Sequence, residues 1–137
     1  MCGIIGYTGC EKCVPILLDG LDSLSYRGYD SVGISVNDDG IETYKVRGRI
    51  SALRDMVGTK KDDDVHCGIG HTRWATHGAP TDINAHPHCT DLLSVVCNGI
   101  IENYASIAAY LRERGYSFVS ETDTEVAAKL IDFCYRN

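Results

Sequence analysis

The chain opens with the sequence Met1-Cys2-Gly3-Ile4-Ile5-Gly6-Tyr7. Residues 3–7 form a short apolar run, which is typical of a buried β-strand and places Cys2 at the start of that strand. Once Met1 is removed, the thiol and a free α-amine belong to the same residue. An α-amine titrates at roughly 7.7–8.0, close enough to neutrality to take the thiol's proton through a water. The opening makes Cys2 a candidate nucleophile, but by itself it does not outweigh the plainer alternative of a buried N-terminal cysteine, and the other motifs must decide.

Hydrophobic periodicity predicts most of the remaining elements. Apolar residues recur at helical spacing from Val14 to Leu24, and Pro15 is tolerable there because it falls in the first turn. Two stretches joined by Asn37-Asp38-Asp39-Gly40 predict a β-hairpin, since this composition favours tight turns. The predicted helices cover residues 14–24, 107–111 and 126–134, and the predicted strands cover residues 3–7, 31–36, 41–46 and 92–96.

Local signals complete the outline of a mixed chain. The last helix is expected to begin near Thr122 or Asp123, where Glu125 is available for a capping box. Residues 58–64, in which two lysines precede three aspartates, predict a solvated surface turn. Strands and helices intermix, which gives the α+β class, but the pattern alone does not decide how the strands pair.

Composition narrows the class of function. With 137 residues, the chain is long enough for one domain with a buried core. Its net charge of -6 argues against a nucleic-acid partner, because phosphate binding needs clustered Lys and Arg. We expect no membrane contact, since no apolar run approaches the length of a span and the start lacks the features of a signal peptide. Seven cysteines without small-domain spacing fit reduced thiols, so we expect a cytoplasmic protein with a small-molecule site.

Five motifs occur in order along nearly the whole chain. They are Met1-Cys2-Gly3-Ile4-Ile5-Gly6, Tyr26-Arg27-Gly28-Tyr29-Asp30-Ser31, His71-Thr72-Arg73-Trp74-Ala75-Thr76-His77-Gly78, Asn98-Gly99-Ile100-Ile101-Glu102-Asn103 and Glu121-Thr122-Asp123-Thr124-Glu125. Together they resemble the N-terminal-nucleophile glutamine amidotransferases, and within that family most closely the glucosamine-6-phosphate synthase branch. Amidophosphoribosyltransferases and asparagine synthetases share the N-terminal cysteine but carry different residues in the second and third motifs, so these branches rank second.

The resemblance has consequences for the fold and the extent of the domain. It implies a four-layer α/β/β/α fold, in which two β-sheets face each other between layers of helices. Residues 1–137 are then expected to be the leading part of a type 2 glutamine amidotransferase domain. This expectation places the end of the domain, and a separate sugar-phosphate isomerase domain, outside these residues.

The resemblance also implies a catalytic group around Cys2. Cys2 would attack the side-chain amide of L-glutamine, ammonia would leave, and water would resolve the thioester to glutamate. The Asn98 side chain and the Gly99 backbone N–H would form the oxyanion hole, with donors fixed before the reaction. Without the resemblance, Asn98-Gly99 after an apolar strand predicts a type I′ hairpin turn.

A binding site for both ends of glutamine follows from the same resemblance. Arg73 would pair with the α-carboxylate through its planar guanidinium, and Asp123 would receive the α-ammonium. Thr76, His77 and Gly99 would supply further contacts, partly through backbone groups. From the pattern alone, Arg73 is a solvated surface charge and Asp123 the N-cap of a helix, although Asp123 could cap and bind at once.

Three further positions complete the expected site. Arg27 resembles a residue behind the site that orders the Cys2 terminus, and Trp74 resembles the lid that shuts the pocket. The family commonly has His before the Asn-Gly pair, whereas this chain has Cys97. The difference affects the packing and hydrogen bonding behind Asn98 but leaves both proposed oxyanion donors in place.

No metal or other cofactor is expected. His86, His88 and Cys89 lie close together, and Cys10 and Cys13 are spaced as a C-x-x-C pair. Structural zinc sites usually show two well-spaced ligand pairs, and a thioredoxin-like pair needs a βαβ context that this sequence lacks. Ordinary packing is the preferred interpretation of these residues.

The predicted partners follow from the predicted reaction. They are L-glutamine as substrate and the sugar-phosphate isomerase domain of a full-length enzyme, which would use the ammonia to convert fructose 6-phosphate to glucosamine 6-phosphate. A homo-oligomer is left open. The competing hypothesis from a different class is a catalytically silent fragment, or a binding module that keeps the site residues without turnover.

Overall fold

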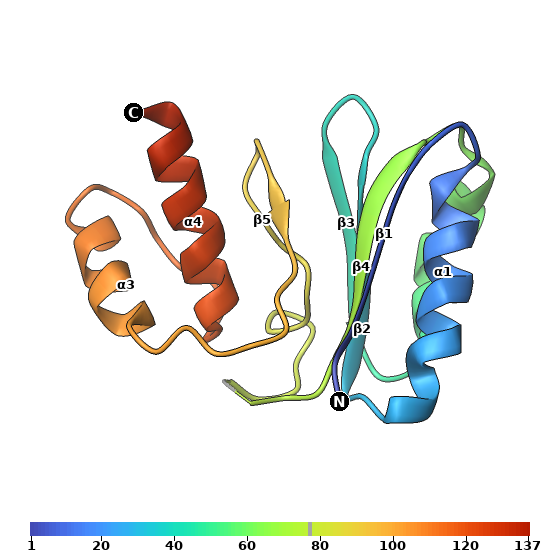
Figure 1. Ribbon diagram of the computed structural model, residues 1–137, viewed down its shortest axis with the longest axis horizontal. Helices are drawn as coiled ribbons and strands as arrows, with labels where there is room; N and C mark the ends of the chain where they lie inside the picture. Colours follow the sequence, from blue (N-terminus) through green and yellow to red (C-terminus); the bar gives the residue numbers. More distant parts are fainter. Residues whose placement is uncertain (77) are drawn as a thin grey trace.

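The structure, a computed structural model, describes residues 1–76 and 78–137. Figure 1 shows its layers side by side: α1, a four-stranded sheet, a two-stranded ribbon, and α4 with α3 outside it. The predicted α+β class and the α/β/β/α arrangement are confirmed. The elements are β1 (Gly3–Thr8), α1 (Cys13–Leu24), η1 (Ser25–Arg27), β2 (Ser31–Asn37), β3 (Ile41–Arg47), α2 (Ile50–Val57), η2 (Gly58–Asp62), β4 (Cys67–Arg73), β5 (His88–Cys89), β6 (Ser94–Val95), α3 (Tyr104–Arg112) and α4 (Asp123–Arg136).

The four-stranded sheet, called the main sheet below, has the strand order β1-β4-β2-β3. All neighbouring strands are antiparallel. The predicted hairpin of β2 and β3 is confirmed, and it turns through Asp39 and Gly40, whose φ angles are 52° and 152°. Because β1 pairs with β4 from Gly3↔Thr72 to Thr8↔Cys67, the start of β1 lies beside the end of β4. This register brings Cys2 next to Arg73.

One face of the main sheet forms the larger core with α1 and α2. Val32 and Ile34 of β2 pack there with Leu17 and Leu21 of α1 and Leu53 of α2, all of them completely buried. Each such side chain contributes roughly 1.5–3 kcal/mol when it leaves water. Since α1 also contacts β1 and β4 directly, this core fixes the two strands whose ends carry Cys2 and Arg73.

The other face of the main sheet meets the segment that leads into the ribbon of β5 and β6. Gly33 marks the closest approach, because a Cβ built there would overlap the carbonyl oxygen of His86 and the Cβ of Lys45. The Lys45 ammonium donates to three backbone carbonyls between residues 83 and 87, at 2.9 to 3.3 Å. The absence of a side chain at Gly33 and the partly buried Lys45 ammonium therefore hold this segment against the sheet.

The ribbon is shorter than the sequence predicts. A strand was expected over residues 92–96, but β6 covers only Ser94–Val95 and pairs with the equally short β5. The Thr90 N–H donates to the Leu93 carbonyl at 2.9 Å and closes the turn between them. Residues 92 and 93 thus belong to the turn, and Leu92 is exposed, so the apolar run there does not mark a longer strand.

α3 and α4 pack together around Leu111 and Val126 in a second core. The predicted start of α4 is confirmed: the Thr122 side chain accepts from the Glu125 N–H at 3.3 Å. The Glu125 carboxylate, however, accepts from the N–H groups of Val119 and Ser120 rather than from Thr122 itself. Glu125 therefore also fixes the loop that enters α4, which a simple capping box does not do.

Residues 58–64 lie at the surface as predicted, and all of them except Lys60 are exposed. Residues 58–62 form the 3₁₀ helix η2, and the Lys60 side chain is only 10% exposed. Its ammonium lies 2.6 Å from Asp38, 3.0 Å from Glu42 and 3.2 Å from Asp63. These carboxylates raise the pKa of Lys60. The sequence could not show this, because Asp38 and Glu42 are brought to Lys60 only by the β2–β3 hairpin.

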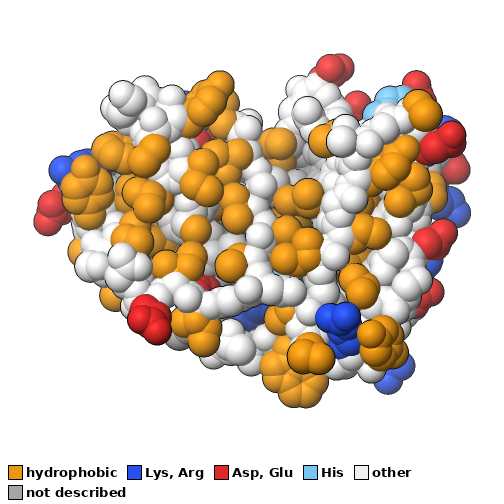
Figure 2. All heavy atoms as spheres, viewed as in Figure 1, with side chains coloured by type: hydrophobic (Ala, Val, Ile, Leu, Met, Phe, Trp, Pro, Cys, Tyr) orange, Lys and Arg blue, Asp and Glu red, His pale blue; other side chains and the backbone are white. Residues whose placement is uncertain are grey.

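Several large apolar side chains remain on the surface. Figure 2 shows hydrophobic atoms spread across the face seen there, including the part between the two helical layers. Among the described residues, no helix is both long and apolar enough to span a bilayer. The more exposed apolar residues include Ile4, Leu92, Ile100 and Ile131.

Candidate active site

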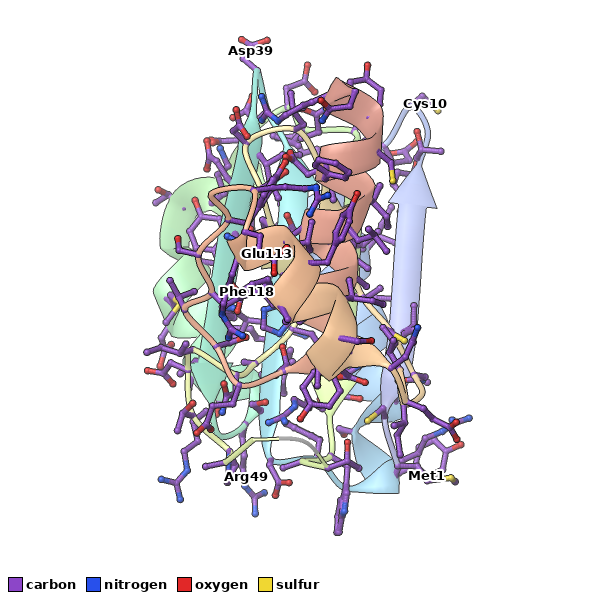
Figure 3. The ribbon with its side chains drawn as sticks, turned by 90° about the vertical axis from the view of Figure 1, so that its left-hand side faces the viewer. Met1, Cys10, Asp39, Arg49, Glu113 and Phe118 are labelled. Atoms are coloured by element: carbon purple, nitrogen blue, oxygen red, sulfur yellow. The ribbon has the colours of Figure 1, made fainter. Side chains whose placement is uncertain are left out.

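A cavity of about 270 Å³ opens where the layers meet at one end of the main sheet. It lies at the end that carries the N-terminus, opposite the β2–β3 turn at Asp39, as Figure 3 shows for Met1 and Asp39. The walls come from five separate stretches of chain: the start of β1, the end of β4 with the loop after it, residue 86, the segment after β6 and the start of α4. Its lining residues are Cys2, His71, Arg73, Trp74, Thr76, His86, Cys97, Gly99, Ile100, Thr122, Asp123 and Thr124.

The Cys2 sulfur is held by the backbone of the neighbouring strand end. The Trp74 N–H donates to Sγ at 3.1 Å, and Sγ lies 3.7 Å from the Trp74 carbonyl oxygen. These contacts follow from the β1–β4 register and fix the sulfur at the cavity wall. Cys10 lies at the far end of β1 from Met1 (Figure 3), so it is remote from this site.

The N-terminal amine is anchored beside the site. The Met1 amine donates to the carbonyl of Arg27 at 3.0 Å and to that of Gly28 at 3.4 Å. The Arg27 side chain points elsewhere, because it is exposed and its Nε donates to the Tyr26 hydroxyl at 3.3 Å. Arg27 thus contacts the terminus through its backbone, whereas the family resemblance had suggested a role without saying which atoms carry it.

Asn98 and Gly99 border the cavity beside Cys2. Nδ2 of Asn98 donates to the Cys2 carbonyl at 3.2 Å, and Oδ1 lies 3.0 Å from Nε2 of His71. The alternative of a hairpin turn at these residues is wrong, because β6 ends at Val95 and the next element is α3. The Asn-Gly pair instead belongs to an irregular segment that places the Asn98 amide against the Cys2 carbonyl.

Arg73 and Asp123 face the same cavity from different layers. Arg73, the last residue of β4, is 3% exposed, so the alternative of a solvated surface charge is wrong. Its guanidinium donates to the carbonyls of Gly78 and Ala79 at 3.2 and 3.3 Å. Burial lowers the pKa of Arg73, while Cys2, Asp30 and Asp123 act in the opposite direction. A buried cation thus faces an anionic side of the cavity.

Asp123 is the first residue of α4 and is 5% exposed. The N-cap of that helix is Thr122, so the N-cap alternative for Asp123 is wrong. Oδ2 of Asp123 accepts from the Ile101 N–H at 2.7 Å, which ties the segment after Asn98 to α4. The carboxylate therefore both organises the cavity wall and presents negative charge there.

The remaining predicted residues lie around the cavity mouth. Thr76 is exposed and lines the cavity, while Trp74 is 51% exposed, with its ring 3.2 Å from where a Cβ on Gly28 would stand. His77 lies outside the described residues. The structure thus brings together Cys2, Arg73, Trp74, Thr76, Asn98, Gly99 and Asp123, while the Arg27 side chain stands apart.

The chain matches the family described as "Glutamine amidotransferase domain" over residues 53–134, which is more than half of its length. It belongs to this glutamine amidotransferase family.

Relatives of this amidotransferase domain carry a more specific name. It is 53% identical to the glutamine–fructose-6-phosphate aminotransferase (isomerizing) of Caldanaerobacter subterraneus, over 98% of this chain and 22% of the relative. The enzyme of the same name from Thermus thermophilus is 52% identical over 99% of this chain and 23% of the relative. The chain therefore spans about a fifth of the length of the curated relatives it matches.

Solved structures match the fold of the amidotransferase domain. Bacillus subtilis glutamine phosphoribosylpyrophosphate amidotransferase, complexed with ADP and GMP, matches with a TM-score of 0.77 and 29% identity, over 94% of this chain and 29% of that chain. A structure of the allosteric regulatory enzyme of purine biosynthesis gives the same TM-score at 28% identity and the same coverage. Identities near 50% to the aminotransferases confirm the order in which the two branches were ranked.

A stack of three buried histidines lies behind the amidotransferase cavity, and sequence reasoning missed it. The rings of His71 and His86 stack with centroids 4.2 Å apart, and His86 meets His88 edge-on at 4.8 Å. Nε2 of His88 lies 2.8 Å from Oγ1 of Thr122. The stack thus runs from Asn98 to the N-cap of α4. The sequence did contain one signal for His71: side chains alternate along a β-strand, so residues 71 and 73 share one face of β4.

A second missed group holds the carbonyls that face Arg73. Asn84 is 2% exposed, and its Nδ2 donates to Ala79 O and to Glu121 Oε2, both at 2.9 Å. Its Oδ1 accepts from the Glu121 N–H at 2.9 Å. Gly78 has a φ of 81°, and a Cβ there would overlap this amide. Asn84 therefore joins the loop after β4 to the loop before α4.

The described residues offer little for a metal. No group of three or more His, Cys, Asp or Glu side chains among residues 1–76 and 78–137 is arranged to hold an ion. Cys89 lies 2.8 Å from the Thr43 hydroxyl, and His88 faces Thr122. The histidines and cysteine considered for zinc are therefore used in packing and hydrogen bonding between layers.

Mild acid is expected to unfold the domain through the histidine stack. Burial lowers the pKa of His71 to about 4, of His86 to about 2 and of His88 to about 3, from an ordinary 6.5. Below pH 6.5 these three histidines are protonated in the unfolded chain but stay neutral in the folded chain. The free energy of unfolding should then fall by up to about 1.4 kcal/mol per pH unit for each histidine.

The measurement is urea unfolding at constant ionic strength between pH 7.5 and 4.5. The stabilisation from the neutral rings is complete above pH 6.5 and decreases as pH falls toward 4. His86→Phe, which removes a titrating ring but keeps an aromatic stack, should flatten the slope, whereas His66→Gln at the surface should not. A pH-independent midpoint would contradict the prediction.

Proposed function

We propose that the domain hydrolyses the side-chain amide of L-glutamine to glutamate and ammonia, with Cys2 as nucleophile. The observation that carries the proposal is that Cys2, Arg73 and Asp123 line one cavity from segments far apart in sequence, with the Asn98 amide bonded to the Cys2 carbonyl beside it. A sulfur, an amide donor, a cation and an anion are the groups that such a reaction on a zwitterionic amino acid needs.

The chemistry needs no group beyond the chain and water. Sγ of Cys2 attacks the amide carbon, and the resulting oxyanion is stabilised by Nδ2 of Asn98 and the N–H of Gly99. The Cys2 α-amine, free once Met1 is removed, takes the thiol proton and returns it to the departing ammonia. Water then attacks the γ-glutamyl thioester, which yields glutamate and restores the thiol.

Recognition of the substrate uses its two charged ends. Arg73 pairs with the α-carboxylate, for which a guanidinium offers two parallel hydrogen bonds, and Asp123 receives the α-ammonium. Thr76 and the backbone of Gly99 add polar contacts, and His77 keeps the same assignment from the family motif. Trp74 closes the cavity mouth, and the Arg27 backbone orders the terminus that carries Cys2.

The ammonia is proposed to serve amino-sugar synthesis. The relatives are named as isomerizing aminotransferases that act on glutamine and fructose 6-phosphate. The proposed partner is therefore a sugar-phosphate isomerase domain, which would use the ammonia to convert fructose 6-phosphate to glucosamine 6-phosphate. The seven cysteines of the chain are all unpaired, which supports a reducing compartment such as the cytoplasm. No nucleic acid, membrane or cofactor is part of the proposal.

The direct test is release of glutamate and ammonia from L-glutamine by the purified chain. Equimolar formation of both products, with L-asparagine turned over far more slowly, supports the proposal. Binding of glutamine in calorimetry without either product would instead favour the competing hypothesis of a silent binding module.

Asn98→Ala is expected to lower kcat by about 10²–10³-fold, the usual effect of removing one oxyanion-hole donor. The KM for glutamine should change little, because the amide acts mainly on charge that develops in the transition state. Steady-state kinetics of glutamate release measure both quantities.

Arg73→Ala serves as the contrasting variant. Loss of the cation that pairs with the α-carboxylate should raise KM strongly and leave the oxyanion donors intact. An interchange of the two patterns, with Asn98→Ala acting on KM and Arg73→Ala on kcat alone, would mean that the roles are reversed.

A further inference from the structure

The cavity end of the histidine stack contains one hydrogen-bond arrangement that fixes a protonation form. Nε2 of His71 lies 3.1 Å from the carbonyl oxygen of Cys97 and 3.0 Å from Oδ1 of Asn98. A backbone carbonyl only accepts hydrogen bonds, so Nε2 must carry a hydrogen. Burial lowers the pKa of His71 to about 4, so the ring is neutral at pH 7 and Nδ1 carries no hydrogen.

The surroundings of Nδ1 agree with this assignment. Nδ1 of His71 is buried and has no hydrogen-bond partner among the described residues. A hydrogen placed there would lose its bonds to water without gaining an acceptor, which is costly in a buried site. The ring is also confined by its stack on His86, 4.2 Å away. His71 therefore presents a single N–H, at Nε2, toward Cys97 and Asn98.

A fixed donor at this place decides the orientation of the Asn98 amide. With Nε2–H donating to Oδ1, Nδ2 is turned toward Cys2 and donates to its carbonyl at 3.2 Å. A flipped amide would set Nδ2 against the His71 N–H and Oδ1 against the Cys2 carbonyl. The first contact would then join two donors and the second would join two acceptors, so neither could be a hydrogen bond. Since an NH₂ group has two hydrogens, one remains for the cavity in the observed orientation.

We propose that His71 is a positioning residue, whose Nε2–H locks the Asn98 amide with Nδ2 toward the substrate carbonyl. The inference rests on the proposed glutamine hydrolysis. Although His71 also lines the cavity, its proposed role is exerted through Asn98, to which its Nε2 is hydrogen-bonded. Without it, the amide rotates and presents an acceptor to the developing oxyanion for part of the time.

Two substitutions separate this role from simple packing. His71→Leu fills the space but has no donor, and it should lower kcat by about 10–100-fold with KM within about threefold of the wild type, less than complete loss of the amide costs. His71→Gln carries an amide N–H₂ that can reach the position of Nε2, and it should restore most of kcat. Equal losses in both variants would mean that His71 acts only through packing.

A double-mutant cycle and a spectroscopic measurement complete the test. In the Asn98→Ala background, His71→Leu should have little further effect on kcat, because the amide it orients is gone. Long-range ¹H–¹⁵N correlation spectra of the wild-type chain should show His71 as the neutral Nε2–H form between pH 6 and 8.

Each outcome decides between the inference and the function on which it rests. An Nδ1–H form, or an undiminished effect of His71→Leu without Asn98, overturns the inference alone. A wild-type chain that shows the Nε2–H form but releases no glutamate overturns the proposed function and with it the catalytic meaning of the contact.

Discussion

Cys2→Ala should abolish glutamate release from L-glutamine. Removal of the nucleophile from a hydrolase that forms a covalent intermediate lowers turnover by on the order of 10⁶-fold, which here means the assay background. The side chain is small and partly exposed, and its removal opens only the cavity wall. Glutamine binding should therefore persist, because Arg73 and Asp123 stay in place. Turnover and calorimetric binding are measured on the same preparation.

Cys97→Ala is the matched control for this loss. Cys97 lines the same cavity and is also partly buried, but its carbonyl, not its sulfur, holds His71. It should keep most of the turnover and still react at Cys2 with a glutamine-like diazo-ketone. Label on Cys67 or Cys97 in peptide maps, or turnover that survives Cys2→Ala, would show that the nucleophile is misassigned.

A chain that keeps Met1 should hydrolyse glutamine at least about 10²–10⁴ times more slowly than the processed chain, which is the usual contribution of general acid–base catalysis. In the Met1 form, the nitrogen of Cys2 is a peptide amide and accepts no proton. The Met1 amine is also turned away, onto the carbonyls of Arg27 and Gly28. Mass spectrometry of the N-terminus, paired with turnover of the same sample, checks the prediction.

Removal of Met1 from the inactive form should restore its activity. Treatment of the Met1 form with methionine aminopeptidase should recover turnover in proportion to the fraction of free Cys2. Full turnover from wholly Met-initiated protein would show that another group takes the thiol proton.

Elements with a local periodic signal could be predicted from the sequence. The helix that begins near Val14 and the hairpin around Asn37–Gly40 repeat apolar residues with the period of their own structure, and both are confirmed. β5 and β6 have two residues each, too few for any period to be visible. Their position depends on Lys45 and Gly33, which act from another strand.

The candidate site was predictable in its residue types but not in its construction. The motifs indicated Cys2 and Arg73, yet only the β1–β4 pairing brings them together, and hydrophobic pattern does not decide pairing. His71 and Asn84 were not assigned roles, because the value of a buried polar side chain lies in partners that tertiary structure supplies. The same reason explains why the partial burial of Lys60 was not predicted.

The close approach at Gly33 bears on selectivity for the substrate. Arg73 belongs to the main sheet and Asp123 to the α4 layer, while Gly33 and His86 determine how closely the two halves of the molecule approach. A site that recognises both charges of an amino acid tolerates errors of only about 0.5 Å. If Arg73 and Asp123 bind the two ends of glutamine as proposed, their separation depends partly on the absence of a side chain at Gly33, which lies outside the cavity. Selectivity for the length of the substrate would then depend on how the two layers pack as well as on the residues of the cavity.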